Sequence, residues 1–169
     1  MIGIGSDDLG FALKEHIREL LRQRGESVQD FGVYSTETAD YPDIGVKLAE
    51  AVRSGLLERG VLVCGTGLGM AIVANKVPGV FAAPVNSVEL AVAARRSNNA
   101  QIITLGARIV SPDEASAIVA AWLAARFRGG RSARKVAKVR LVEARYLPAR
   151  ARRARAPVDE ATLLCAARG

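Results

Sequence analysis

The sequence predicts a three-layer α/β sandwich with a five-stranded parallel sheet, followed by a helical arm toward the C-terminus. Five short apolar runs alternate with segments whose apolar residues have helical spacing. The runs are continuously apolar, which is typical of strands covered on both faces. Strands and helices that alternate in this way connect through right-handed crossovers. The expected fold is therefore Rossmann-like, and such sheets bind ligands beyond the carboxyl ends of their strands.

Each element has a local signal in the chain. In the first expected helix, Leu13, Ile17 and Leu21 recur at helical spacing, and Gly25 follows as a stop. Residues 32–43 contain turn-forming residues and are expected to form a loop. The strands are expected at residues 1–5, 27–31, 60–64, 80–83 and 101–105. The helices are expected at residues 11–24, 44–54, from the end of a 65–69 loop to about 76, 87–96 and 112–126.

Composition divides the chain of 169 residues into a domain at 1–138 and a basic, Ala/Arg-rich extension at 139–169. Pro148 and Pro157 interrupt the extension, so we expect a helical arm with a partly disordered end. The net charge of +7 arises from the arginines and lysines after residue 125. A basic tail can bind nucleic acid, membranes or acidic partners. Because few aromatic residues are interleaved with the charges, a solvated helix is favoured and nucleic-acid binding is not.

Several classes of protein are disfavoured. No apolar run reaches the roughly 20 residues of a membrane helix, and the N-terminus lacks a signal-peptide pattern, so a cytoplasmic location is expected. Cys64 and Cys165 do not make a disulfide framework. His16 is the only histidine, and no Cys/His cluster has zinc spacing, so no metal site is expected.

The strongest local feature is the segment Cys64-Gly65-Thr66-Gly67-Leu68-Gly69, between an expected strand and helix. Its glycines allow a tight turn that exposes backbone N–H groups, and the helix N-terminus adds partial positive charge. Such a loop suits a phosphate or an enediolate and favours the ionised form of a nearby thiol. A buried cysteine before an ordinary turn is the alternative. The segment fits neither a Walker motif nor a dinucleotide-binding fingerprint.

Other polar residues follow or precede strands. Asp7 and Asp8 could bind sugar hydroxyls or a metal, or could cap the first helix. Tyr41 lies in the expected long loop, residues 95–99 precede the fifth strand, and Arg108 follows it. Each signal is weak alone. We expect these residues to gather near one edge of the sheet, which favours a common site.

Six motifs together resemble the family that contains ribose-5-phosphate isomerase B and galactose-6-phosphate isomerase. The resemblance extends from residue 1 to about 139. The motifs are GSDDLGF at 5–11, DFGVYS at 30–35, DYPD at 40–43, VCGTGLGMAIVANKVPGV at 63–80, NNAQIITLGAR at 98–108 and GGR at 129–131.

The resemblance implies an aldose–ketose isomerase that acts on a small sugar phosphate through a cis-enediol. By this resemblance, Cys64 carries a proton between C1 and C2 of the sugar, and Thr66 helps to move protons among the sugar oxygens. The amides of Gly65, Gly67 and Gly69 stabilise the enediolate. The sugar site is lined by Asp7, Tyr41 and Asn98, and the phosphate by Arg108, Arg131 and one or both of Arg134 and Lys135. The resemblance also implies no cofactor and a homodimer or homotetramer whose sites are shared between subunits, with Arg131 able to reach the partner's pocket.

Three family histidines are replaced, by Asp8, Ser97 and Ser132. The family position of Ser97 is linked to opening the sugar ring, and the other two to phosphate binding. A four-carbon sugar phosphorylated on O4 cannot close into a ring, so the substrate is expected to be a tetrose phosphate or another open-chain sugar, with ribose 5-phosphate as the alternative.

Asp8 raises a separate question, because a carboxylate about 4 Å from a phosphate charge costs on the order of 4 kcal/mol. Asp8 therefore turns away, is neutralised by an arginine, or faces a displaced or absent phosphate. A non-catalytic sugar-phosphate-binding or regulatory relative is a second hypothesis, which the retained Cys64 and Thr66 oppose.

Overall fold

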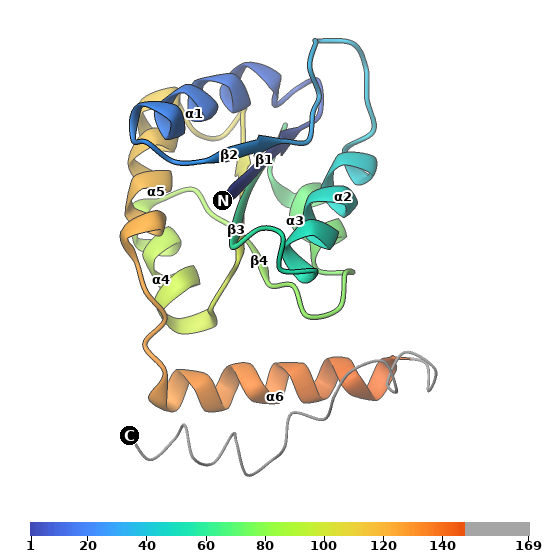
Figure 1. The fold of residues 1–169 in the computed structure, drawn as a ribbon, viewed down its shortest axis with the longest axis vertical. Coiled ribbons are helices and arrows are strands. Elements are labelled where there is room, and N and C mark those ends of the chain that lie inside the picture. Colours follow the sequence, from blue (N-terminus) through green and yellow to red (C-terminus); the bar gives the residue numbers. More distant parts are fainter. Residues whose placement is uncertain (148–169) are drawn as a thin grey trace.

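The computed structural model describes residues 1–147 and contains five strands and six helices in that part of the chain (Figure 1). The strands are β1 (Ile2–Ser6), β2 (Val28–Asp30), β3 (Arg59–Cys64), β4 (Ala82–Pro84) and β5 (Ile102–Gly106). The helices are α1 (Phe11–Gln23), α2 (Tyr41–Arg53), α3 (Leu68–Ala74), α4 (Val88–Asn98), α5 (Pro112–Ala124) and α6 (Gly130–Tyr146).

All strand pairs are parallel, and the sheet order is β2-β1-β3-β5-β4. The predicted α/β sandwich with a C-terminal helical arm is therefore confirmed. After β2 the chain crosses to the other side of β1 to form β3, so the strand order reverses between β1 and β3. Ligands of open α/β sheets bind at such a reversal, beyond the carboxyl ends of the strands. This rule directs attention to the loops that follow Ser6 and Cys64.

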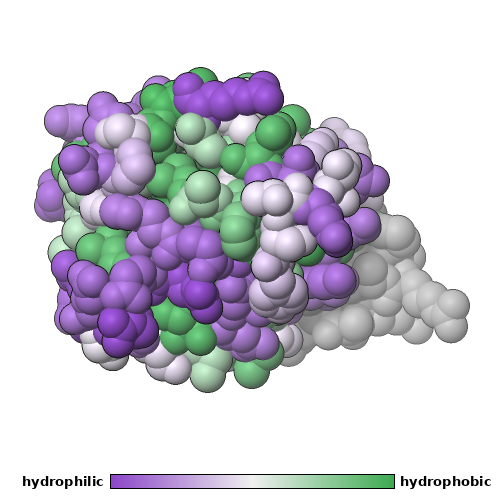
Figure 2. All heavy atoms as spheres, turned by 90° about the horizontal axis from the view of Figure 1, so that it is seen from above, coloured by the Kyte–Doolittle hydropathy of each residue, from purple (hydrophilic) through white to green (hydrophobic). Residues whose placement is uncertain are grey.

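Helices cover both faces of the sheet, as Figure 1 shows, with α1, α4 and α5 on one face and α2 and α3 on the other. Neighbouring strand residues alternate between the two cores: Ile103 packs with the first group of helices and Ile102 with the second. This two-sided burial explains why the strands read as continuous apolar runs. Outside the core, hydrophobic side chains lie in small groups between hydrophilic ones on the face seen in Figure 2.

Several predicted boundaries were wrong. Helix α2 begins at Tyr41 rather than at residue 44, because Pro42 suits the first turn of a helix, where its missing N–H is not needed. Strand β4 is Ala82–Pro84 rather than 80–83, because the Val80 N–H donates to the Val77 carbonyl in a turn. Helix α5 ends at Ala124, short of the expected residue 126.

Helix α4 extends through Asn98, two residues beyond the expected end, and Asn99 terminates it in a left-handed conformation (φ 55°). Asparagine tolerates this conformation better than most residues, so it can end a helix as glycine does. Ser97 and Asn98 therefore lie in the last turn of a helix.

Helix α6 lies below the sheet in Figure 1 and contacts α4. Val136 is its buried residue, the Arg140 guanidinium lies 5.8 Å from the Phe81 ring centroid, and Glu143 Oε1 accepts a hydrogen bond from Gly79 N–H at 2.7 Å. The helix runs unbroken across residues 138 and 139, where the boundary between the two domains is expected. The division into two domains stays a prediction. Cys165, the two prolines and the expected disordered end lie outside the described residues. Within residues 1–147, no helix has the length and apolarity needed to cross a membrane.

Candidate active site

The candidate site forms where β1, β3 and β5 end side by side. Cys64, the last residue of β3, is paired with Gly106, the last residue of β5. Two hydrogen bonds join the loops that follow these strands: Ala107 N–H donates to the Cys64 carbonyl at 2.8 Å, and Arg108 N–H donates to the Gly65 carbonyl at 3.0 Å. The loop after β3 is therefore fixed to its neighbour rather than free.

The Cys64 sulfur accepts a hydrogen bond from the Gly67 N–H, with an N···S distance of 3.1 Å. Gly67 has a φ of 80°, a left-handed conformation that glycine adopts without strain, and this conformation turns its N–H back toward the sulfur. The Gly67 carbonyl in turn accepts a hydrogen bond from Thr104 Oγ1 at 2.7 Å. A backbone donor aimed at sulfur stabilises negative charge on it.

Cys64 is only 5% exposed in the single chain and packs with residues of α2 and α3. The alternative interpretation, a buried cysteine before an ordinary turn, is thus correct about burial. The turn is not ordinary, however, because one of its amides is directed at the sulfur. Thr66 is exposed beside it, and its Oγ1 accepts a hydrogen bond from Leu68 N–H at 3.4 Å.

Tyr41 covers the start of α3. A Cβ added at Gly69 would lie 2.7 Å from Tyr41 Cζ, which is too close for any side chain. The Tyr41 ring can therefore pack against the loop because residue 69 is glycine. On another side of the loop, a Cβ at Gly65 would lie 3.8 Å from Arg108 Nε. A phenol and a guanidinium therefore flank the glycine loop, as expected for a site that takes a polar anionic ligand.

Asp7 is buried at the end of β1, and its Oδ1 accepts a hydrogen bond from Gly10 N–H at 2.8 Å. Burial raises the pKa of Asp7 above its ordinary value; the Gly10 N–H opposes this rise and the nearby Asp8 charge adds to it. Sequence reasoning missed Ser6 as a candidate, although it ends the same strand. Its hydroxyl is buried and has no hydrogen-bond partner within the described part of the chain.

Asp8 turns toward the loop after β2, where its Oδ1 accepts a hydrogen bond from Ala39 N–H at 3.3 Å. Of the alternatives given for the Asp8 charge, the structure shows the first, in which the side chain turns away. Asp8 does not cap α1, because the N-cap residue is Gly10 and no side chain caps that helix end. The helix-cap interpretation of Asp8 was therefore wrong.

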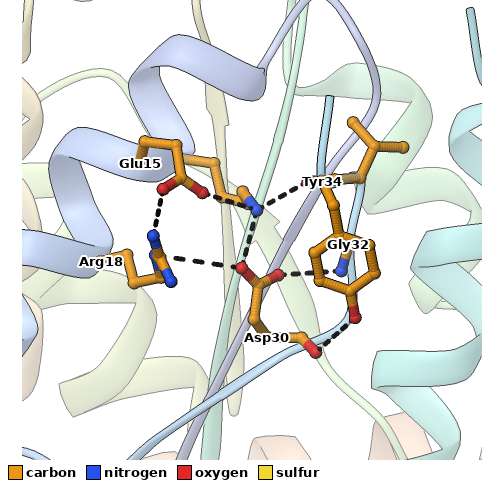
Figure 3. Close-up of polar contacts among 7 residues, drawn as sticks. Glu15, Arg18, Asp30, Gly32 and Tyr34 are labelled. Atoms are coloured by element: carbon orange, nitrogen blue, oxygen red, sulfur yellow. Dashed lines mark hydrogen bonds and ion pairs between the residues drawn. The ribbon is translucent and has the colours of Figure 1, made fainter. Parts of the chain in front are cut away.

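A buried lysine holds the other end of the same loop (Figure 3). Lys14, on α1, is fully buried, and its Nζ donates to Asp30 Oδ2 at 2.8 Å and to the Val33 carbonyl at 2.7 Å. Glu15 Oε1 lies 2.9 Å from the same nitrogen. Burial raises the pKa of Glu15, but hydrogen bonds from Lys14 and Arg18 outweigh it, so the pKa lies below its ordinary value. We call Lys14, Glu15 and Asp30 the lysine cluster.

The lysine cluster also organises the backbone that leads to Tyr41. Asp30 Oδ1 accepts a hydrogen bond from Gly32 N–H at 2.8 Å, and the Tyr34 hydroxyl donates to the Asp30 carbonyl at 3.1 Å, as Figure 3 shows. The Lys14 ammonium lies 5.5 Å from the Tyr34 ring centroid. Together with Asp8, the cluster anchors residues 32–40 to the start of α1.

The structure does not bring all the predicted site residues together in one chain. Ser97 and Asn98 end α4 just before β5 begins, whereas Cys64 lies beyond the ends of the strands. Because a crossover helix runs antiparallel to its strands, its last turn lies at the amino edge of the sheet. The expectation that residues 95–99 share an edge with Cys64 was wrong for a single chain.

A pocket of about 360 Å³ lies at this amino edge. It is lined by Ser97, Asn98, Ser132 and Lys135, among others. Arg131 and Arg134 are exposed on the first turns of α6. The predicted residues thus form two groups, one at each edge of the sheet.

Comparison with known proteins identifies the family and the fold. Residues 2–139 match the Ribose/Galactose Isomerase family. The chain belongs to this family. It is 48% identical over 139 residues to the D-erythrulose-4-phosphate isomerase of Pectobacterium atrosepticum, with 82% of this chain and 91% of that protein covered.

Solved structures of the ribose/galactose isomerase family have the same fold. Ribose-5-phosphate isomerase B of Clostridium thermocellum superposes with a TM-score of 0.85 at 49% identity, covering 86% of this chain and 99% of that one. The enzyme of Mycoplasma genitalium, solved with bound ribulose-5-phosphate, gives 0.81 at 40% identity, covering 84% and 95%. The predicted family and the prediction of an aldose–ketose isomerase are therefore confirmed.

Proposed function

We propose that the protein interconverts the aldose and ketose forms of an open-chain, four-carbon sugar phosphate, with ribose 5-phosphate as the alternative substrate. The observation that carries this choice is Ser97, at the position that the family resemblance links to opening the sugar ring. A hydroxyl is a far weaker acid and base near neutral pH than the imidazole it replaces. An open-chain tetrose phosphate needs no ring opening. The 48% identity to a D-erythrulose-4-phosphate isomerase supports the same substrate.

In the proposed reaction, the Cys64 thiolate removes a proton from the carbon next to the carbonyl. Electrons of the broken C–H bond form the enediolate, whose negative charge falls on the former carbonyl oxygen. Backbone amides of the 65–69 loop stabilise this charge. The same sulfur returns the proton to the neighbouring carbon, while Thr66 assists proton movement between the two oxygens. No electrons leave the substrate, so the reaction needs no oxidant or reductant.

The complete site is proposed to require two subunits. Cys64 and Tyr41 lie at one edge of the sheet, and Asn98 lies at the other, beside Lys135. A homodimer or homotetramer that brings the amino edge of one chain to the carboxyl edge of another would supply Asn98, Arg131 and their neighbours to each Cys64. Arg108, from the same chain as Cys64, would contribute a first guanidinium to the phosphate.

The proposal is tested by NMR of D-erythrulose 4-phosphate incubated with the enzyme in D₂O. The wild type is expected to form D-erythrose 4-phosphate and to introduce deuterium at the carbon next to the carbonyl. Cys64→Ala should lower both rates at least about a hundredfold, because a positioned general base contributes roughly 10²–10⁴-fold. Absence of turnover by the folded wild type, or a Cys64→Ala variant within tenfold of it, would reject the proposal.

A further inference from the structure

Another cavity, of about 570 Å³, lies at the amino edge of the sheet and is separate from the residues assigned above to the active site. It is bounded by the start of β3, by α4 and by the connection from α5 to α6. Its lining residues are Glu58, Arg59, Arg95, Leu123, Ala124, Arg126 and Phe127. Three guanidinium groups therefore surround one space that contains a single carboxylate, that of Glu58.

Arg59 has a structural role that accounts for most of its donors. Its Nη1 donates to the carbonyls of Trp122 and Leu123 at 3.0 and 2.9 Å, and its Nη2 donates to the Ala125 carbonyl at 3.3 Å. These bonds satisfy carbonyls at the end of α5. The Arg59 Nε, by contrast, is buried without a hydrogen bond, and its nearest counter-charge is Glu58 Oε1 at 3.5 Å. Arg59 itself is 9% exposed.

Arg95 has less compensation. Its one hydrogen bond, from Nη1 to the Ala100 carbonyl, is long at 3.5 Å, and its Nε is buried without a partner in the described structure. Burial lowers the pKa of Arg95, and the charge of Arg59 lowers it further, against a smaller opposite effect of Glu58. Two partly desolvated guanidiniums thus line one cavity. Like charges in this arrangement are costly unless an anion or water compensates them.

We propose that this cavity binds a phosphate anion, either inorganic phosphate or the phosphate of a small monoester. A phosphate dianion accepts several N–H bonds at once, and guanidinium groups match its geometry. Binding there offsets the neighbouring positive charges of Arg59 and Arg95, and Arg126 supplies a third positive charge from the exposed rim. The negative end of α5 does not repel the ligand strongly, because Arg59 already neutralises it. Phe127 and Leu123 leave room for a small organic group.

The test observes the Nε–H resonances of arginine by ¹H–¹⁵N NMR while potassium phosphate is added to the full chain at constant ionic strength. The Arg59 and Arg95 signals, assigned by substitution, are expected to shift saturably with phosphate and not with potassium chloride. A parallel titration with glycerol 2-phosphate distinguishes the two sources: tighter binding identifies a monoester site, and equal or weaker binding identifies a site for free phosphate. Phosphate shifts that never saturate, or that chloride reproduces, overturn the proposal.

Matched variants locate the site. Arg95→Gln and Arg126→Gln are each expected to weaken phosphate binding at least tenfold; Arg126 is exposed, so the second variant keeps the fold intact. Arg53→Gln, an exposed arginine at the end of α2, should bind as the wild type does. Arg108→Gln should also leave these shifts unchanged, which separates this cavity from phosphate binding at the active site. Wild-type affinity in the folded Arg126→Gln variant would contradict the assignment.

Discussion

Ser97 is the residue on which the choice of substrate depends. It lies in the last turn of α4 and lines the 360 Å³ pocket together with Asn98. Ser97→His adds an imidazole that can act as acid and base on a ring oxygen. We expect kcat/KM for ribose 5-phosphate to rise at least about tenfold, a modest fraction of what such a group can contribute. Activity with the four-carbon substrate should rise less. Steady-state assays with both substrates measure this.

Ser132→His is the matched control for that experiment, because it adds the same ring to the same pocket from α6. It should not increase the ratio of ribose 5-phosphate to erythrulose 4-phosphate turnover. An unchanged ratio in Ser97→His would show that the missing histidine does not determine the substrate.

Individual residues differ in how well the sequence predicted them. Cys64 and the glycines after it were identified because strand, turn and helix signals adjoin at that point. Asp8 could not be placed, because its partner, Ala39, lies 31 positions away in an irregular loop. Ser6 carried no signal beyond its place at the end of a strand. Side-chain direction within a loop depends on tertiary contacts that a local pattern does not contain.

At the scale of elements, the lysine cluster ties α1 to the backbone after β2. Lys14→Met keeps a long apolar side chain but leaves the Asp30 carboxylate without its main partner. Removing one member of a buried ion pair typically destabilises a protein by about 3–5 kcal/mol, and the partial exposure of Asp30 places the expected loss near 3 kcal/mol. Urea unfolding monitored by circular dichroism measures it.

Lys47→Met is the control, because Lys47 is an exposed lysine on α2. It should change the free energy of unfolding by less than about 0.5 kcal/mol. A loss below 1 kcal/mol in Lys14→Met would mean that the cluster contributes little and that the loop is held by other contacts.

The sequence predicted the existence and order of the elements well, because continuous apolar runs and helical spacing reflect two-sided burial of the sheet. Boundaries were harder. Pro42 reads as a loop residue but also suits a first helical turn, and Asn99, rather than a glycine, terminates α4. The Gly-Gly pair at 129 and 130 reads as a break, yet α6 starts there.

At the scale of the whole molecule, the two groups of site residues lie at opposite edges of one sheet. Sequence reasoning expected residues 95–99 and the loop after Cys64 to gather near a single edge. Helix α4 runs antiparallel to the strands, so its last turn lies at the start of β5, whereas Cys64 lies beside the end of β5. The resemblance to a family with shared sites leads to the proposal that the two groups combine across subunits, which stays a prediction.

Subunit complementation tests this arrangement. If the protein is the proposed homodimer with shared sites, the Cys64→Ala and Asn98→Ala variants should each be nearly inactive. When both variants are expressed together, half of the dimers are mixed and each contains one intact site, so about a quarter of wild-type activity is expected from the symmetry of an isologous dimer. A mixture no more active than the separate variants would place Cys64 and Asn98 in the same subunit's site or outside the site altogether.

The most direct test of the substrate assignment is the ratio of kcat/KM for D-erythrulose 4-phosphate to that for ribose 5-phosphate, measured with the same wild-type preparation. A site that lacks a ring-opening imidazole should favour the open-chain substrate at least about tenfold. A ribose 5-phosphate value equal to or greater than the four-carbon value would contradict it.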